Sequence, residues 1–101
     1  MNFNCELFLF DNHLDISIRS TKKQTLKISD AKLYTRNDFY IINIMPYRIE
    51  VGTIEPAKLH VPFPFDGDFN CISFVVSSIT DKKIYMVEIP FTQVPIYKKI
   101  N

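Results

Sequence analysis

Hydrophobic residues recur at every second position along much of this chain, which is the pattern of a β-strand with one buried face. His13–Ser20 shows the alternation most strictly, with leucine or isoleucine at every other place. Phe3–Phe10 is also apolar at alternate positions but carries further phenylalanines on its second face. Asp11 and Asn12 separate the two segments and are turn formers, so the pattern predicts an antiparallel hairpin.

Two further segments, Phe39–Met45 and Phe69–Ser77, are dense in β-branched and aromatic residues and predict central strands covered on both faces. Proline cannot donate a hydrogen bond to a neighbouring strand, so the proline-containing segments predict edge strands or extended arms. Ser29–Arg36 fits either a strand or a single helical turn, and a strand is preferred. The other predicted strands are Thr25–Ser29, Tyr47–Ile54, Glu55–Phe65 (edge), Ile84–Ile89 and Phe91–Asn101 (edge strand or packed arm).

Breaks in the alternation divide these segments from one another. Pro46 should offset the chain before the next strand, and Gly52 permits a bulge. Asp66 and Gly67 give the strongest turn signal, because glycine adopts positive φ without steric cost. The result is about eight short strands spaced roughly 8 to 12 residues apart. We therefore expect one all-β domain over residues 1–101, an antiparallel β-sandwich or small open barrel with little or no helix.

Composition supports a single folded domain and points to a compartment. The chain has 101 residues, with nine Phe, five Tyr and only two Gly, which suits pleated, half-buried surfaces. The N-terminus has no basic region, and Glu6 and Asp11 interrupt its apolar run, so neither a signal peptide nor a membrane span is predicted. A cytoplasmic protein is expected. In a reducing compartment Cys5 and Cys71 should be free thiols, and a disulfide between them is the alternative.

Residues suited to metal binding or catalysis are few. His13 and His60 stand singly in the sequence, without the short spacing of metal-ligand motifs, so no zinc site is predicted. The same pair could act as acid and base in RNA cleavage, yet any chain with two histidines offers as much. Cys71 lies in a segment that is expected to be buried, where a thiol is unreactive. No nucleophilic site is predicted.

Other ligand chemistries find equally little support. The two glycines belong to no phosphate-binding loop, so no nucleotide cofactor is expected. The aspartate pairs Asp66/Asp68 and Asp11/Asp15 lack the spacing of a calcium-binding loop. The sequence therefore predicts a protein that is not an enzyme and has no cofactor.

Positive charge is concentrated between Arg19 and Arg36, where six basic residues accompany one acid. This segment carries +5 in a chain of net charge +1, which leaves about −4 for the rest and makes the molecule dipolar. Interleaved tyrosines could stack nucleic-acid bases, as in single-strand-binding barrels. The alternative is a solvated face whose lysines protect a strand edge. The residues concerned are Arg19, Lys22, Lys23, Lys27, Lys32, Tyr34, Arg36 and Tyr40.

A second surface is predicted within the segment Leu59–Phe69. Phe63 and Phe65 would form an apolar patch beside Asp66 and Asp68, a composition typical of a protein interface with a polar rim. Such a surface would suit a basic protein partner. In the alternative, both phenylalanines close an open end of the sandwich.

A binding function needs only a rigid scaffold and a surface, and it is the function that the sequence favours. The expected protein covers the working surface of a partner protein, as small inhibitors and toxin-neutralising immunity proteins do. Phe63, Phe65, Asp66 and Asp68 are the first candidates for contact. The alternatives are a nucleic-acid-binding small β-barrel, which would use the basic segment, and a structural subunit of a larger assembly. Monomeric and oligomeric states both remain open.

Overall fold

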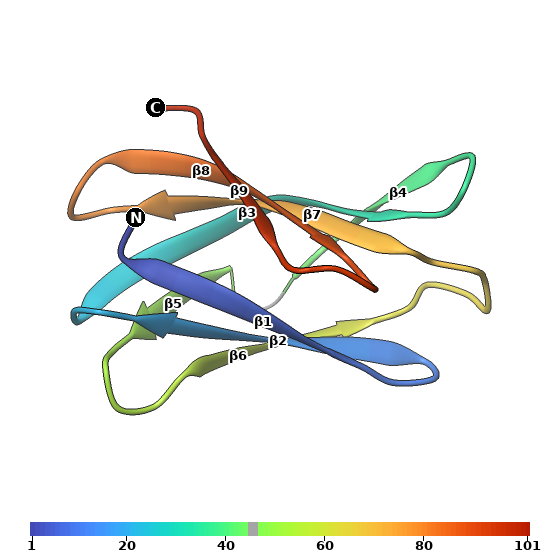
Figure 1. The fold of residues 1–101 in the computed structure, drawn as a ribbon, viewed down its shortest axis with the longest axis horizontal. Helices are drawn as coiled ribbons and strands as arrows, with labels where there is room; N and C mark the ends of the chain where they lie inside the picture. Colours follow the sequence, from blue (N-terminus) through green and yellow to red (C-terminus); the bar gives the residue numbers. More distant parts are fainter. Residues whose placement is uncertain (45–46) are drawn as a thin grey trace.

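Two antiparallel sheets stack face to face in the computed structural model, which describes residues 1–44 and 47–101 (Figure 1). The described residues form nine strands and no helix, so they contain no helix that could cross a membrane. The strands are β1 (Phe3–Leu9), β2 (His13–Ser20), β3 (Gln24–Tyr34), β4 (Phe39–Ile42), β5 (Arg48–Val51), β6 (Ala57–Pro62), β7 (Cys71–Ser78), β8 (Lys83–Pro90) and β9 (Ile96–Lys99).

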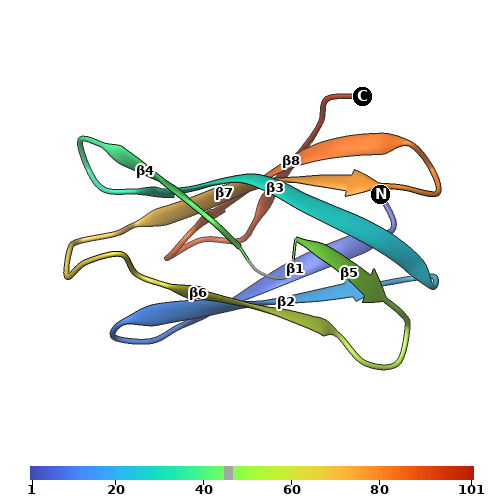
Figure 2. The same cartoon turned by 180° about the vertical axis from the view of Figure 1, so that it is seen from behind.

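The smaller sheet has the strand order β1-β2-β6, and the larger has the order β4-β3-β7-β8-β9. β5 also pairs with β3, on the same edge as β4, because both strands lie opposite the edge that β7 occupies (Figure 2). If β1, β2, β3, β6, β7 and β8 are lettered A, B, C, E, F and G, with β4 and β5 standing in place of strand D, one sheet holds A, B and E and the other holds C, F and G. This is the arrangement of immunoglobulin-like sandwiches, a connectivity that serves many unrelated functions.

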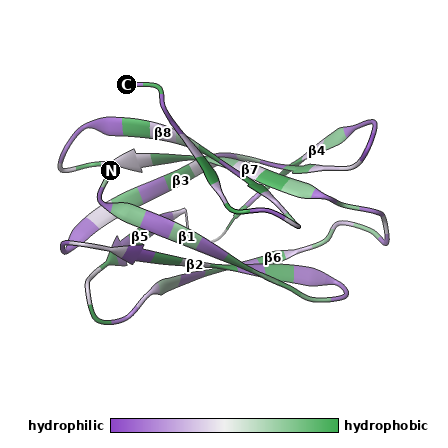
Figure 3. Ribbon diagram, in the orientation of Figure 1, coloured by the Kyte–Doolittle hydropathy of each residue, from purple (hydrophilic) through white to green (hydrophobic). Residues whose placement is uncertain are grey.

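The core lies between the two sheets and is made of the inward members of each alternating strand. Figure 3 shows this alternation as hydrophobic and hydrophilic bands along the strands. Phe74 in β7 is the largest side chain among those that are fully buried. Burying a side chain of this kind contributes roughly 1.5–3 kcal/mol. Other fully buried side chains include Leu14, Ile16, Ile18, Leu26, Leu33, Val51, Leu59, Val61, Ile72, Val76, Val87 and Ile89.

β3 contains a β-bulge, which is the one register shift among the described strand pairs. Ser29 pairs with Val75, but Lys32 pairs with Ser73, so three steps along β3 match two steps along β7. Asp30 has a φ of 53° at this point. Aspartate is among the residues that tolerate this left-handed conformation best.

The bulge changes which residues of β3 face the core. Leu26 and Ile28 point inward before it, and Ala31 and Leu33 point inward after it. The inward residues have even numbers before the bulge and odd numbers after it. In a regular strand without a bulge, one of these two sets would point toward solvent. The extra residue in the bulge restores the inward direction and keeps both halves of β3 in the core.

A hydrogen-bonded network fills one end of the sandwich, which we call the polar end. The Gln24 side chain is buried and donates to Asn2 Oδ1 (2.9 Å) and Ser20 Oγ (2.8 Å). Its own Oε1 accepts a hydrogen bond from Ser78 Oγ (2.9 Å). Asn2 in turn donates to Asp81 Oδ2 (3.1 Å). The network thus ties the N-terminus to the β2–β3 and β7–β8 turns, and no described buried polar side chain lacks a partner.

The first and last strands meet although they belong to different sheets. The Tyr97 ring in β9 packs edge-on against Phe3 in β1, with ring centroids 5.9 Å apart. The Cys5 backbone N–H, also in β1, donates to the Tyr97 hydroxyl (2.7 Å). Partial burial raises the pKa of Tyr97, so the hydroxyl stays protonated and can also donate to Cys5 O (3.5 Å).

Most strand predictions are confirmed, including the first hairpin, the central position of β7, and β6 and β9 as edge strands. Two predicted strands, Thr25–Ser29 and Ser29–Arg36, are instead one bulged strand, and no helical turn forms there. The sheets make a sandwich and do not close into a barrel. Gly52 follows β5 without a register shift. The predicted break at Pro46 lies outside the described residues.

The prediction that Phe39–Met45 forms a central strand is wrong. Over its described part, β4 ends at Ile42 and pairs only with β3, at the edge of the larger sheet. Ile41 is 78% exposed, because β4 turns that face outward and nothing in the described structure covers it. Of the apolar side chains that suggested two covered faces, those on one face of β4 are partly buried and those on the other face are exposed. Met45 lies outside the described residues.

The bulge can be tested by substitution at Asp30. Asp30→Val should lower the free energy of unfolding by about 1–2 kcal/mol, because a β-branched residue pays the full cost of positive φ. Asp30→Gly should change it by less than about 1 kcal/mol, since glycine adopts this conformation freely. Urea unfolding followed by circular dichroism measures both. Thr25→Val, on the same strand with ordinary φ, is the matched control, and equal losses for both Asp30 variants would contradict the interpretation.

Candidate functional site

Four connections between strands meet at the end of the sandwich opposite the polar end, on the right in Figure 1. Backbone hydrogen bonds join three of them: Phe63 N–H donates to Asn12 O (2.9 Å), and Phe91 N–H donates to Asn70 O (2.9 Å). These connections hold five of the nine phenylalanines of the chain, and we call this region the aromatic end. It comprises residues 10–12, 35–38, 63–70 and 91–95, together with Tyr40.

A continuous series of aromatic contacts runs through this end. Phe63 stacks on Phe91 at a centroid distance of 6.4 Å and lies 5.1 Å from Phe69. Phe65 lies 5.1 Å from Phe69 and meets the Tyr40 ring edge-on at 4.9 Å. Such contacts contribute roughly 0.5–1.5 kcal/mol each beyond the area they bury. The rings therefore hold one another in place.

The two predicted phenylalanines differ in exposure. Phe63 is half buried and packs against the core at this end of the sandwich. Phe65 remains 44% exposed, and Phe10 from the neighbouring hairpin is 49% exposed. A hollow of about 250 Å³ lies beside Phe65, between the β1–β2 turn and the β6–β7 loop. Its lining residues are Asp11, Asn12, Phe63, Phe65 and Asp66.

Acidic side chains surround these rings. Asp66 and Asp68 are exposed beside Phe65, as the sequence suggested. Asp11 and Asp38 are added by the neighbouring turns, and Arg36 is the one base in the four connections. Four acids and one base give this end a net charge of −3.

The physical role assigned to Gly67 was wrong. Neither glycine has positive φ. A Cβ atom at position 67 would instead lie 2.9 Å from the Phe65 ring. The glycine therefore matters because it leaves room for Phe65 to lie against the loop backbone.

The predicted basic surface is divided by the fold. Arg19 belongs to β2 in the smaller sheet, whereas Lys27 and Lys32 lie on the outer face of β3 in the larger sheet. Lys22 at the polar end is paired with Asp81, at an Nζ–Oδ1 distance of 2.8 Å. This pair holds the pKa of Asp81 below its usual value. Four of the predicted residues thus occupy three separate places.

The remaining members are divided in the same way. Tyr40 faces the aromatic end, while the Tyr34 hydroxyl hydrogen-bonds Ser73 Oγ (3.0 Å) on the outer face of the larger sheet. Lys23 and Arg36 lie in turns at opposite ends. The outer face of β3 gains a cation that the sequence pattern missed, because Arg48 in β5 pairs directly with Lys27.

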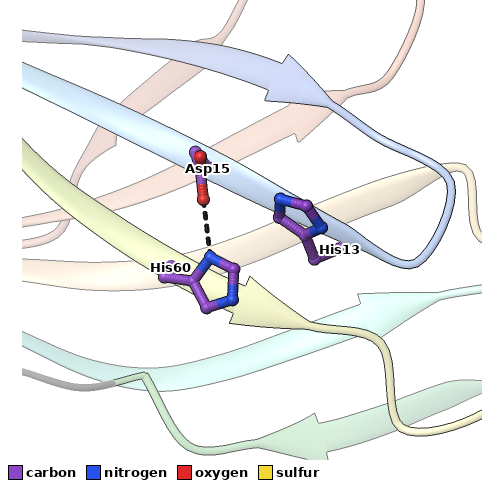
Figure 4. A group of neighbouring side chains, drawn as sticks. All are labelled: His13, Asp15 and His60. Carbon is purple, nitrogen blue, oxygen red and sulfur yellow. Dashed lines mark hydrogen bonds and ion pairs between the residues drawn. The ribbon is translucent and has the colours of Figure 1, made fainter.

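The two histidines form a cluster with Asp15 on the outer face of the smaller sheet (Figure 4). One donor atom from each of His13, Asp15 and His60 lies within 4.8 Å of the others. His60 Nδ1 is 2.8 Å from Asp15 Oδ1, and His13 Nδ1 is 2.7 Å from Asn12 Oδ1. The premise that the histidines stand singly is therefore wrong in space. Strand pairing places position 60 directly opposite position 15.

Both cysteines are free, as predicted. Cys5 is buried, and desolvation raises the pKa of its thiol to about 12. Cys71 was expected to be buried but is half exposed on the outer face of the larger sheet. Partial burial, followed by the charge of Glu88 on the neighbouring strand β8, raises the pKa of Cys71 to about 11. Neither thiol is therefore activated as a nucleophile.

Comparison with known proteins does not identify a relative. No protein-family model matches the chain, and no curated protein or solved structure gives a significant match. The resemblance to immunoglobulin-like sandwiches therefore rests on strand order alone, and evidence about function comes from the surfaces described above.

We expect Cys71 to react slowly with iodoacetamide near neutral pH, because the thiolate is the nucleophile and a raised pKa keeps the thiol protonated. The rate should rise about tenfold per pH unit below that pKa. Glu88→Gln should speed the reaction, since it removes the adjacent negative charge. Mass spectrometry of labelled protein follows the rate. Glu50→Gln, also on the larger sheet, should leave the rate unchanged, and a wild-type rate equal to that of a free thiol would contradict the expectation.

Proposed function

We propose that this protein is a non-enzymatic binding protein that covers the working surface of a protein partner with its aromatic end. The observation that carries the proposal is the exposed Phe65 ring, fixed between Tyr40 and Phe69 and surrounded by acidic side chains. Small inhibitors and toxin-neutralising immunity proteins act in this way, by covering the working surface of a partner.

Rigidity is the first argument for contact through this end. Side chains that are ordered before binding lose less conformational entropy when a partner docks. Phe65 already touches two rings and the backbone at Gly67, so its position is set in the free protein. Aromatic anchors with few remaining degrees of freedom are typical binding hot spots.

The shape of the surface favours a macromolecular partner. The hollow beside Phe65 has a volume of about 250 Å³, below the roughly 300–1,000 Å³ of usual small-molecule pockets. It is large enough for one side chain of a partner. The exposed Phe65 ring, which lines the hollow, would then contact the surface around that side chain.

Charge determines the chemistry of the partner. The net charge of −3 in the four connections favours a basic surface and would speed its association. Asp11 and Asp66 line the hollow itself, so a lysine or arginine side chain fits there best.

A second candidate function is nucleic-acid binding by the outer face of the larger sheet. Its support is the pairing of Lys27 with Arg48 and the position of Lys32, whose Nζ lies 5.0 Å from the centre of the Phe39 ring. No described acid forms an ion pair with these three cations. The dispersal of the other predicted basic residues makes this the weaker candidate.

Parallel affinity capture from the native cells would test the proposal with three baits: wild type, Phe65→Ala, and Ile54→Ala as the matched control. Ile54 is an exposed hydrophobic residue, at 87%, in the β5–β6 loop at the opposite end. A protein held by wild type and Ile54→Ala but lost with Phe65→Ala supports the proposal. The purified partner should bind Phe65→Ala about 30-fold or more weakly, as expected for a hot spot.

Asp66→Asn with Asp68→Asn should weaken the same complex mainly at low salt, because exposed charges are screened as salt rises. Capture that does not distinguish Phe65→Ala from Ile54→Ala would reject the aromatic end as the contact surface. Retention of nucleic acid that falls with salt and with Lys27→Ala would favour the second candidate. Self-association detected by light scattering and lost with Phe65→Ala would instead indicate a structural subunit.

A further inference from the structure

We propose that His13, Asp15 and His60 form a binding site for a divalent transition-metal ion, for which Zn²⁺ is the best probe. The three side chains lie on one face of the smaller sheet and offer two imidazole nitrogens and a carboxylate oxygen (Figure 4). This is a donor set that zinc and its neighbours in the first transition row use in proteins. The inference does not depend on the proposed function.

The backbone brings the three residues together and fixes their separation. His13 and Asp15 are two positions apart in β2, so they point to the same side of the sheet. Asp15 pairs directly with His60 in β6. Six consecutive residue pairs between β2 and β6 hold this register. A ligand set built on paired strands is more precisely placed than one built on loops.

The donor atoms are close to the spacing that a metal requires. They lie within 4.8 Å of one another, whereas ligand atoms around tetrahedral zinc are about 3.4 Å apart, given bonds of about 2.1 Å. Small side-chain rotations would close the difference. The His60 side chain is 62% exposed and the Asp15 side chain 32% exposed, so both have room to rotate.

Neighbouring groups orient the first histidine as outer partners orient ligands in metal sites. The amide oxygen of Asn12 accepts a hydrogen bond from His13 Nδ1 (2.7 Å), which leaves Nε2 with the lone pair that a metal needs. The Phe10 ring stacks on the His13 ring at 4.5 Å, with 9° between the planes. The imidazole is therefore held in one orientation and one tautomer.

Asp15 can contribute in either of two ways. Its carboxylate can ligate the ion directly, or it can accept the hydrogen bond from His60 Nδ1 and so leave Nε2 with the lone pair that a metal needs. Both ways require the same residue and favour binding. Three protein side chains leave at least one coordination position for water or a donor from another molecule. The ligand chemistry selects Zn²⁺, Co²⁺, Ni²⁺ or Cu²⁺ over Mg²⁺ and Ca²⁺, which prefer oxygen donors.

Calorimetric titration of the full chain with Zn²⁺, together with Co²⁺ visible absorption, tests the site. Wild type should bind one ion, and the Co²⁺ complex should show the visible bands of nitrogen and oxygen ligation. His13→Gln, His60→Gln and Asp15→Asn should each weaken binding at least about tenfold, since even outer partners have effects of that size. Glu6→Gln, an exposed acid in β1 of the same sheet but outside the cluster, is the matched control. Circular dichroism confirms that each variant is folded.

Mild acid should release the metal, because an imidazole must be deprotonated to ligate. Mg²⁺ should produce no binding heat under the same conditions. Binding that survives His60→Gln, or that falls equally with Glu6→Gln, would overturn the proposal. So would the absence of both binding heat and Co²⁺ bands at millimolar metal. The cluster would then be a surface hydrogen-bond group between two paired strands.

Discussion

The larger sheet depends on one residue out of register, Asp30 in β3. This strand hydrogen-bonds to β7 along one edge and to β4 and β5 along the other, so an error in its direction would disturb three partners. The bulge reverses the alternation at the point where the hydrophobic positions change from even to odd. Both halves of the strand therefore bury their apolar side chains, and the two sheets share one core.

Alternation of hydrophobic residues was enough to predict an all-β domain and most of its strands, because a period of two is a local property. The joining of two predicted segments into β3 was missed, since Ser29 and Asp30 resemble a turn in sequence. β4 was misplaced for another reason. Its apolar residues fit a covered strand equally well, and only the pairing of distant segments decides which strand is central.

The candidate sites show the same division between local and distant information. Phe65 and its acidic neighbours could be found from sequence because they are adjacent in the chain. The approach of Tyr40 to Phe65, and of His60 to Asp15 across 45 positions, depends on strand register and left no trace in spacing. The predicted basic surface shows the opposite case. Its residues are close in sequence, but the fold places them on two sheets and at two ends of the molecule.

The contact between Tyr97 and β1 has a consequence for how the chain is made. Cys5 and Tyr97 are 92 positions apart, and their hydrogen bond joins the strands at the two extremes of the domain. During translation β1 and β2 can pair early, but the Cys5 N–H in β1 lacks its hydroxyl partner until residue 97 leaves the ribosome. A nascent chain would therefore leave that strand open to other unfinished chains until β9 has been made. The order of synthesis thus decides how long this part of β1 stays exposed.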